Sequence, residues 1–287
     1  MQCFLCGAKD KKFYLEKKNF KYFRCGNCGL ISLEKVPENL SDYYSKGYFT
    51  GDLDLDGYMD YESEKELTIA TFKKYLNLIT KANKNVGSLF EVGCATGCFL
   101  DLAKNSGWSV AGMDISSYAT DECKKKGLDV SCSTLEDFNN LEGGKYDAVA
   151  MFDVIEHLVD PVAGLKKING LLKTGGLVAF ATPDSGSLWA SAWKTKWHAF
   201  VPPQHINLFS VKNVKLLLQK SGFEPVFISH YGKTFAIPYI FRLLNTWTKI
   251  KFWRFMANFS ANNKFLKNIS IPINLGDTMF VIAKKIN

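Results

Sequence analysis

The sequence predicts an α/β fold built on a mostly parallel sheet with helices on both faces. Short apolar runs alternate with amphipathic runs over about residues 62–230, and this alternation is typical of parallel sheets. One junction, residues 88–97 (SLFEVGCATG), joins an apolar run to a helix through a turn bounded by glycines. Open α/β sheets bind nucleotide-type cofactors at such a turn. We therefore predict a Rossmann-like sheet of seven strands.

The chain begins with two cysteine pairs, Cys3-x-x-Cys6 and Cys25-x-x-Cys28, separated by 18 residues. This spacing predicts a zinc ribbon over residues 1–36, with four thiolates around one structural ion. So short a segment cannot build a sufficient core, so the metal would supply its folding energy. The other four cysteines lack the spacing, and we expect buried or half-buried thiols at Cys94, Cys98, Cys123 and Cys132.

Residues 37–61 form a linker in which tyrosines alternate irregularly with aspartates. It is either a loop packed by its own aromatic rings or a lid over the active site, because long loops often carry function. The main α/β core is then expected over residues 62–230, opening with a helix at about 62–81 and the strand 89–92. The later elements are expected in the order strand 109–114, helix 116–126, strand 128–133, strand 146–151, helix 161–173 ended by Gly175-Gly176, strand 177–183, helix 211–221, strand 223–230 and a last strand at 277–285.

The glycine turn reads Glu91-x-Gly93-Cys94-x-x-Gly97, with Ala95 at the position where a dinucleotide fingerprint has its middle glycine. An acid two residues before the first glycine does not suit a pyrophosphate, but it suits a cationic or hydroxyl-rich ligand. Asp114 ends the next strand, 17 residues after Gly97, near the distance at which an acid holds ribose hydroxyls.

Several further segments arrive in a set order: LEDF (135–138), YDAVAMFDVIEHLVDP (146–161), LLKTGGLVAFATP (171–183) and QHINLFSVKNVKLLLQKSGF (204–223). With the glycine turn, they resemble the class I S-adenosylmethionine (SAM) methyltransferases, in particular the ubiquinone-pathway O-methyltransferases and bacterial sugar methyltransferases. The resemblance implies SAM as cofactor and a hydroxyl of a sugar, sugar nucleotide or glycan as acceptor. It implies cofactor contacts at Glu91, Gly93, Cys94, Ala95, Gly97, Asp114, Ile115, Leu135, Glu136, Phe152 and Tyr61.

Asp153-x-x-Glu156-His157 has i, i+3, i+4 spacing, which would put the three side chains on one face of a helical turn. It resembles the E-x-x-E-H motif that binds a divalent ion in some ubiquinone-pathway and small-RNA methyltransferases, where a later histidine matches His205. Three hypotheses stay open: a divalent ion held by these four residues, a general base at His157 or His205, and a hydrogen-bonded pair that packs under the cofactor. His198 and His230 are expected to be structural.

Charge is unevenly placed: residues 1–36 carry a net +5, residues 37–230 a net −5 and residues 231–287 a net +8. The basic, aromatic insert 231–276 has two interpretations: a cap that packs over the substrate site, or an interfacial helix that contacts a membrane or a lipid-linked substrate. The chain has no signal-peptide pattern and no run of about 18 apolar residues, so we expect a cytoplasmic protein without a membrane span.

Two other function classes stay open beside the leading hypothesis. One is a zinc-ribbon RNA methyltransferase, which predicts a continuous basic face. The scarcity of arginine (three residues) and the lack of an N-P-P-Y type motif make nucleic acid an unexpected partner. The other is a module that binds SAM without turnover.

Overall fold

The computed structural model describes residues 2–37, 65–138, 143–263, 265–266 and 269–286. The predicted lid therefore lies outside the described residues, apart from its first residue, and so does Tyr61. Among the described helices, we find none with the length and hydropathy needed to span a bilayer.

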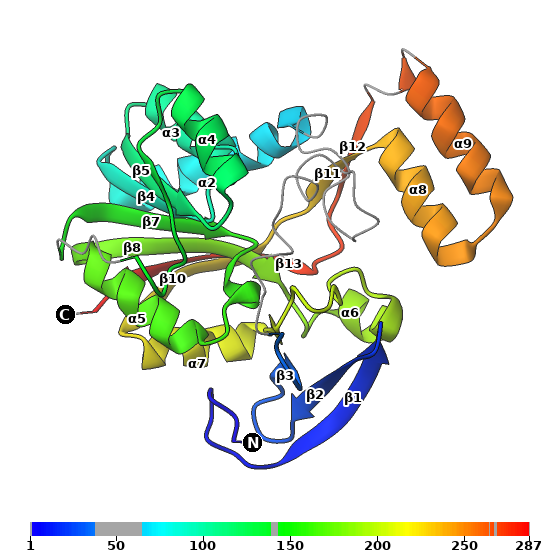
Figure 1. The fold of residues 1–287 in the computed structure, drawn as a ribbon, viewed down its shortest axis with the longest axis horizontal. Helices are drawn as coiled ribbons and strands as arrows, with labels where there is room; N and C mark the ends of the chain where they lie inside the picture. The colour runs from blue at the N-terminus through cyan, green and yellow to red at the C-terminus, as the bar shows by residue number, and fades with distance from the viewer. Residues whose placement is uncertain (1, 38–64, 139–142, 264, 267–268, 287) are drawn as a thin grey trace.

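A seven-stranded sheet forms the centre of the molecule, with the strand order β10-β13-β8-β7-β4-β5-β6 (Figure 1). Strand β13 runs antiparallel to both of its neighbours, and the other six strands run in one direction. The mostly parallel, Rossmann-like fold is thus confirmed. The strands are β4 (Ser88–Val92), β5 (Ser109–Asp114), β6 (Val130–Cys132), β7 (Tyr146–Phe152), β8 (Leu172–Pro183), β10 (Phe223–His230) and β13 (Thr278–Lys285).

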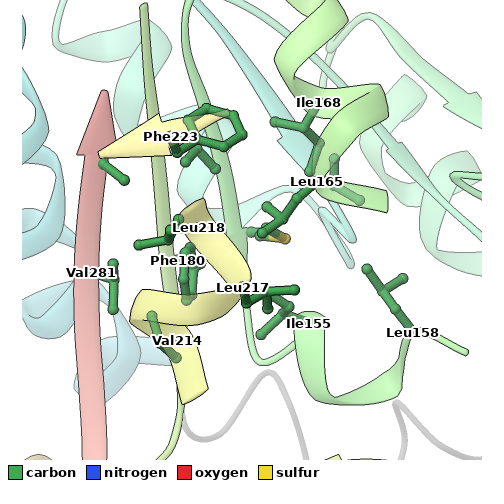
Figure 2. Close-up of a cluster of buried hydrophobic side chains, with 14 of the residues drawn as sticks. Ile155, Leu158, Leu165, Ile168, Phe180, Val214, Leu217, Leu218, Phe223 and Val281 are labelled. Carbon is green, nitrogen blue, oxygen red and sulfur yellow. The ribbon is translucent and has the colours of Figure 1, made fainter. Parts of the chain in front are cut away.

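Alternating side chains of the sheet enter two separate cores. Phe180 and Val281 face one core with helices α5 (Pro161–Leu171) and α7 (Val211–Lys220) (Figure 2). Ala148 and Ala179 face the other, with helices α2 (Lys65–Asn83), α3 (Cys98–Asn105) and α4 (Ser117–Lys125). Strands buried on both faces are apolar at most positions, which is why the central strands read as nearly continuous apolar runs.

The prediction that Gly175-Gly176 ends a helix is wrong. Helix α5 ends at Leu171, and Leu172 already pairs with Tyr146 at the start of β8. The register then shifts, so that Ala148 pairs with Leu177. The glycines lie inside this irregularity, where Gly175 takes a left-handed φ of 74°, a conformation that glycine adopts at little cost.

The cysteine ribbon is a small antiparallel sheet of strands β1 (Lys11–Lys17), β2 (Phe20–Cys25) and β3 (Ile31–Leu33). Lys18 and Asn19 join β1 to β2 with positive φ at both positions, as a two-residue hairpin turn requires. A fourth strand comes from far along the chain, since β9 (Asn207–Leu208) pairs with β3. The ribbon is therefore joined through β9 to the chain segment that follows β8, and it is not a separate appendage.

The insert 231–276 contains two helices, α8 (Ile237–Thr248) and α9 (Lys251–Asn262), and a two-stranded sheet of β11 (Lys233–Ala236) and β12 (Ser270–Ile273). Helices α8 and α9 stand as a hairpin away from the seven-stranded sheet (Figure 1). Two short elements, α6 (Leu188–Trp193) and the 3-10 turn η3 (Lys194–Lys196), lie between β8 and β9. Neither these short elements nor the division of the insert was predicted from the sequence.

Candidate functional site

The glycine turn follows β4 and has no room for side chains at its two glycines. A Cβ added to Gly93 would lie 2.5 Å from Val154 Cγ2, and one added to Gly97 would lie 2.6 Å from Leu128 Cδ1. Both glycines have left-handed φ angles of 71° and 80°. Gly97 caps helix α3 without a side-chain hydrogen bond, so the first amides of α3 are available to a ligand.

Asp114 ties this turn to the end of β5. Its Oδ2 accepts a hydrogen bond from the Ala95 amide at 2.8 Å, and its Oδ1 accepts one from the Ser116 amide at 2.9 Å. Burial raises the pKa of Asp114, while these amide bonds act in the opposite direction. Each carboxylate oxygen has a second lone pair, so Asp114 can still accept hydroxyl donors.

Glu91 is a carboxylate buried in the sheet beside the turn. It is 3% exposed, and its Oε2 has no hydrogen-bond partner among the described residues. Burial raises its pKa well above the usual range, and Cys123 and Asp114 act in the same direction. An unsatisfied buried oxygen costs free energy that a bound N–H or O–H donor would recover. Thr96 Oγ1, in the turn, is likewise buried without a hydrogen-bond partner among the described residues. This residue was not predicted, because threonine has no fixed place in the motif.

Cys94, Ile115 and Phe152 lie around the same edge. Cys94 is buried and shares a side-chain hydrogen bond with Cys123. Ile115 is half-buried directly after Asp114. Phe152 ends β7 with its ring 4.8 Å from that of Phe99, so it packs into the core under α3.

Leu135 and Glu136 differ in their surroundings. Leu135 is buried in the core with helix α5, whereas the Glu136 side chain is exposed and its carbonyl accepts a bond from Lys167 Nζ at 2.7 Å. Of the remaining cysteines, Cys98 and Cys123 are buried, but the expectation for Cys132 is wrong: it is exposed because β6 is the edge strand.

A second cluster, which we call the η2 cluster, joins Glu156 and His157 of the short 3-10 turn η2 (Ile155–His157) to His205. The ligand atoms of Glu156, His157 and His205 all lie within 4.8 Å of one another. The two imidazole rings meet edge to face at a centroid distance of 4.7 Å. Asp153 is outside this group of three, although its charge still acts on His157.

The local structure after β7 positions Asp153 and Glu156. Asp153 takes a left-handed φ of 53°, and its amide donates to Ala181 O at 3.0 Å. A left-handed aspartate is sparsely populated and marks a functional turn in many enzymes. Glu156 is fully buried, and Thr182 Oγ1 donates to its Oε2 at 2.9 Å.

The histidines are held in defined orientations. His205 Nδ1 lies 2.7 Å from Ala199 O, so it donates there and Nε2 carries the lone pair. Desolvation lowers the pKa of His157 to about 3; His205 acts in the same direction, while Asp153 and the Gln204 backbone oppose the shift. A neutral imidazole is the form that binds a metal ion.

The ribbon holds the chain around His205. The Tyr22 hydroxyl donates to His205 O at 2.9 Å, and the Leu33 amide donates to Ile206 O at 2.8 Å. The Ile206 amide in turn donates to Glu156 O at 2.9 Å. The segment that carries His205 is thus fixed between the ribbon and η2, an arrangement that no local sequence pattern signals.

The four ribbon cysteines form a compact cluster with all sulfurs within 4.8 Å. Cys3 Sγ lies 3.7 Å from Cys28 Sγ, and Cys6 Sγ lies 3.5 Å from Cys25 Sγ. A tetrahedral zinc site with bonds of about 2.3 Å separates its sulfurs by about 3.8 Å. The donor set therefore fits zinc. Burial raises the pKa of Cys6, but hydrogen bonds from the Ala8 backbone, Asn27 and neighbouring cysteines outweigh this effect and lower that pKa to about 6.

Comparison with known proteins identifies the fold family. A family model described as a methyltransferase domain matches residues 63–227, more than half of the chain. The chain belongs to the methyltransferase domain family. The glycine turn, Asp114 and the η2 cluster all lie inside the matched range.

Similar curated proteins include two named ubiquinone biosynthesis O-methyltransferase. The one from Cereibacter sphaeroides is 29% identical over 158 residues, and the one from Bradyrhizobium is 26% identical over 154 residues. These matches cover 48% and 47% of this chain and 60% of each relative. The chain therefore spans less than two thirds of the length of the relatives that it matches.

Similar solved structures share the fold at low identity. A SAM-dependent methyltransferase from Archaeoglobus fulgidus superposes with a TM-score of 0.55 at 22% identity, over 83% of this chain and 99% of that one. Magnesium protoporphyrin IX methyltransferase from Synechocystis gives a TM-score of 0.55 at 15% identity, over 86% and 98%.

The other two histidines of the chain each face an acid. His230 Nε2 lies 2.7 Å from Asp184 Oδ2, and His198 Nδ1 lies 3.5 Å from Asp277 Oδ2. Both histidines were predicted to be structural, and neither acid was predicted. His230 ends β10 and Asp184 follows β8, while Asp277 directly precedes β13.

Proposed function

We propose that the protein binds SAM over the glycine turn and transfers its methyl group to an acceptor. The observation that carries the proposal is the buried, unsatisfied Oε2 of Glu91, next to a turn that leads into helix α3 without a side-chain cap. When bound, SAM supplies an electrophilic methyl group on a sulfonium. Glu91 would accept from its amino group, and Asp114 would accept from its ribose hydroxyls.

The acceptor we propose is a hydroxyl of a sugar, sugar nucleotide or glycan. Oxygen is supported by the name of the curated relatives, which are O-methyltransferases. The sugar is supported by the resemblance of the motif series to bacterial sugar methyltransferases. Ligands of open α/β sheets bind outside the carboxyl ends of the strands, and Glu156, His157 and His205 gather beside the carboxyl end of β7.

These three residues would hold a divalent cation, with one carboxylate and two neutral imidazoles as ligands. Mn²⁺ and Zn²⁺ suit such a donor set, and Mg²⁺ accepts it less readily. A cation at this point would lower the pKa of the acceptor hydroxyl. Thr182 and the Ala199 carbonyl, which bond to Glu156 and His205, would orient two of the ligands.

The ribbon cysteines would hold a structural zinc ion. Four thiolates leave no open position for a substrate, so this ion would take no part in the reaction. Its role would be to fold a segment too small for its own core.

Methyl transfer is tested with purified protein, radiolabelled SAM and a panel of sugar nucleotides, lipid-linked glycans and RNA. We expect transfer to a sugar hydroxyl, loss of turnover in a brief chelator treatment that leaves the ribbon zinc in place, and recovery with Mn²⁺. His157→Ala and His205→Ala should each lose at least about 100-fold in rate, while His198→Ala serves as the matched control.

Each contrary outcome has a distinct meaning. Labelled RNA would support the RNA methyltransferase hypothesis, and SAM binding without turnover on any acceptor would support a binding module. Wild-type rates in both His157→Ala and His205→Ala would contradict the assignment of this cluster. Activity that ignores the chelator but falls with acid near the histidine pKa, about 6.5 before any shift, would favour a general base.

A further inference from the structure

The outward face of helix α9 carries a row of exposed aromatic side chains. Phe252, Phe255 and Phe259 follow i, i+3, i+7 spacing and are 55%, 65% and 49% exposed. Thirteen large hydrophobic side chains are strongly exposed in the described part of the chain, and seven of them fall between residues 250 and 271. Apolar exposure this concentrated marks an interaction surface.

The inner face of α9 is already occupied. Trp253 stacks on Phe241 of α8 with a centroid distance of 5.8 Å, while Ala257 and Ser260 are buried. The phenylalanine row therefore lies on the side of α9 that faces away from α8. Figure 1 shows that the hairpin also stands clear of the seven-stranded sheet. Neither α8 nor the sheet therefore covers the phenylalanine row.

The charges beside the row are all of one sign. Lys251 and Arg254 are exposed on the helix surface next to the row, and Lys249 is exposed in the turn before α9. The whole insert 231–276 has seven lysines and arginines and no aspartate or glutamate. An aromatic stripe flanked by cations is the pattern of a helix that lies in a bilayer interface.

We propose that the α8–α9 hairpin binds the surface of an anionic lipid bilayer, with the phenylalanine row in the acyl boundary and the cations among the headgroups. A second copy of this chain is a poorer occupant, because it would bring two sets of seven cations together without an acid. A nucleic acid would use the cations but leave most of the apolar row without a role. The proposal is independent of the acceptor in the methyl-transfer reaction.

The test is flotation of the full-length protein with vesicles. One set contains equal parts of phosphatidylglycerol and phosphatidylcholine, and the other contains phosphatidylcholine alone. We expect at least about tenfold stronger binding to the anionic vesicles, weakened by high salt. The double variant Phe252→Ser/Phe255→Ser and the double variant Lys251→Gln/Arg254→Gln should each bind at least about tenfold more weakly.

Phe13→Ser is the matched control, since Phe13 is 59% exposed on strand β1 of the ribbon, and it should bind like the wild type. Circular dichroism of each variant checks that the fold is retained, which surface substitutions on one helix face should preserve. The proposal is overturned if the wild type does not float with anionic vesicles, or if the α9 variants float as well as the wild type. It is equally overturned if the phenylalanine row is required for dimerisation, or if the hairpin binds single-stranded RNA and not vesicles.

Discussion

Substituting Tyr22 by phenylalanine tests whether the ribbon positions the η2 cluster. The Tyr22 hydroxyl is fully buried and donates to His205 O at 2.9 Å. Burial raises the pKa of Tyr22, so the hydroxyl remains a donor at any working pH. The substitution removes one neutral hydrogen bond and leaves the His205 carbonyl without this donor, a loss of about 1 kcal/mol.

A loss of this size corresponds to about a fivefold change in an equilibrium constant. The hydrogen bonds donated by the Leu33 and Ile206 amides remain, so the segment stays in place but holds His205 less tightly. We therefore expect Tyr22→Phe to weaken Mn²⁺ binding at Glu156, His157 and His205 by about fivefold. SAM affinity should not change, because the Tyr22 hydroxyl donates to the His205 carbonyl and not to the glycine turn.

Mn²⁺ binding is measured by electron paramagnetic resonance on protein whose ribbon zinc has been quantified. Tyr14→Phe is the matched control, because Tyr14 and Tyr22 both pack on Phe200, with ring centroids 6.1 Å and 5.1 Å away. Equal Mn²⁺ affinity in Tyr22→Phe, Tyr14→Phe and the wild type would refute the reasoning that the ribbon positions His205.

Three further predictions concern the glycine turn and the ribbon. Ala95 has a left-handed φ of 46°, so Ala95→Gly should leave the free energy of unfolding unchanged or raise it by up to about 1 kcal/mol. The matched variant Ala103→Gly, in helix α3, should lower the free energy of unfolding by about 1 kcal/mol or more. Urea unfolding measures both values, and equal losses in the two variants would be the contrary result. Because the pKa of Glu91 is raised in the folded protein, the folded state binds more protons than the unfolded state above about pH 4.5, and this group should destabilise the ligand-free protein progressively as pH rises. Unfolding from pH 5 to 8 should show a smaller decline for Glu91→Gln, and parallel pH profiles would count against it. Cys25→Ser should lose zinc by elemental analysis and lower the melting temperature, while Cys132→Ser, at an exposed cysteine, should keep both.

The seven-stranded sheet could be predicted because its strands and helices are each encoded by local patterns. The apolar run before Gly93, interrupted by Glu91, and the amphipathic run after Gly97 both read directly from the sequence. Gly175-Gly176 misled the analysis because paired glycines end helices and also form bulges in strands. Only the pairing of Leu172 with Tyr146 decides between the two, and that is a tertiary contact.

The candidate site divides in the same way. The spacing of Glu156 and His157 pointed to one cluster, but the contribution of the ribbon to His205 depends on the pairing of β3 with β9. These strands are far apart in the chain, and β9 has only two residues, so no periodicity could reveal it. The exposed row on α9 was likewise hidden, because aromatic spacing cannot tell which face of a helix another helix covers.

The central claim, that the glycine turn binds SAM, is tested most directly by calorimetric titration of SAM into the wild type and Asp114→Ala. The substitution removes a carboxylate that would make charge-assisted hydrogen bonds to the ribose, so affinity should fall at least about tenfold, or about 1.4 kcal/mol. Asp101→Ala, at an exposed acid in the first turn of α3, should bind like the wild type. Equal SAM affinity in Asp114→Ala and the wild type, or no SAM binding by the wild type at all, would contradict the claim.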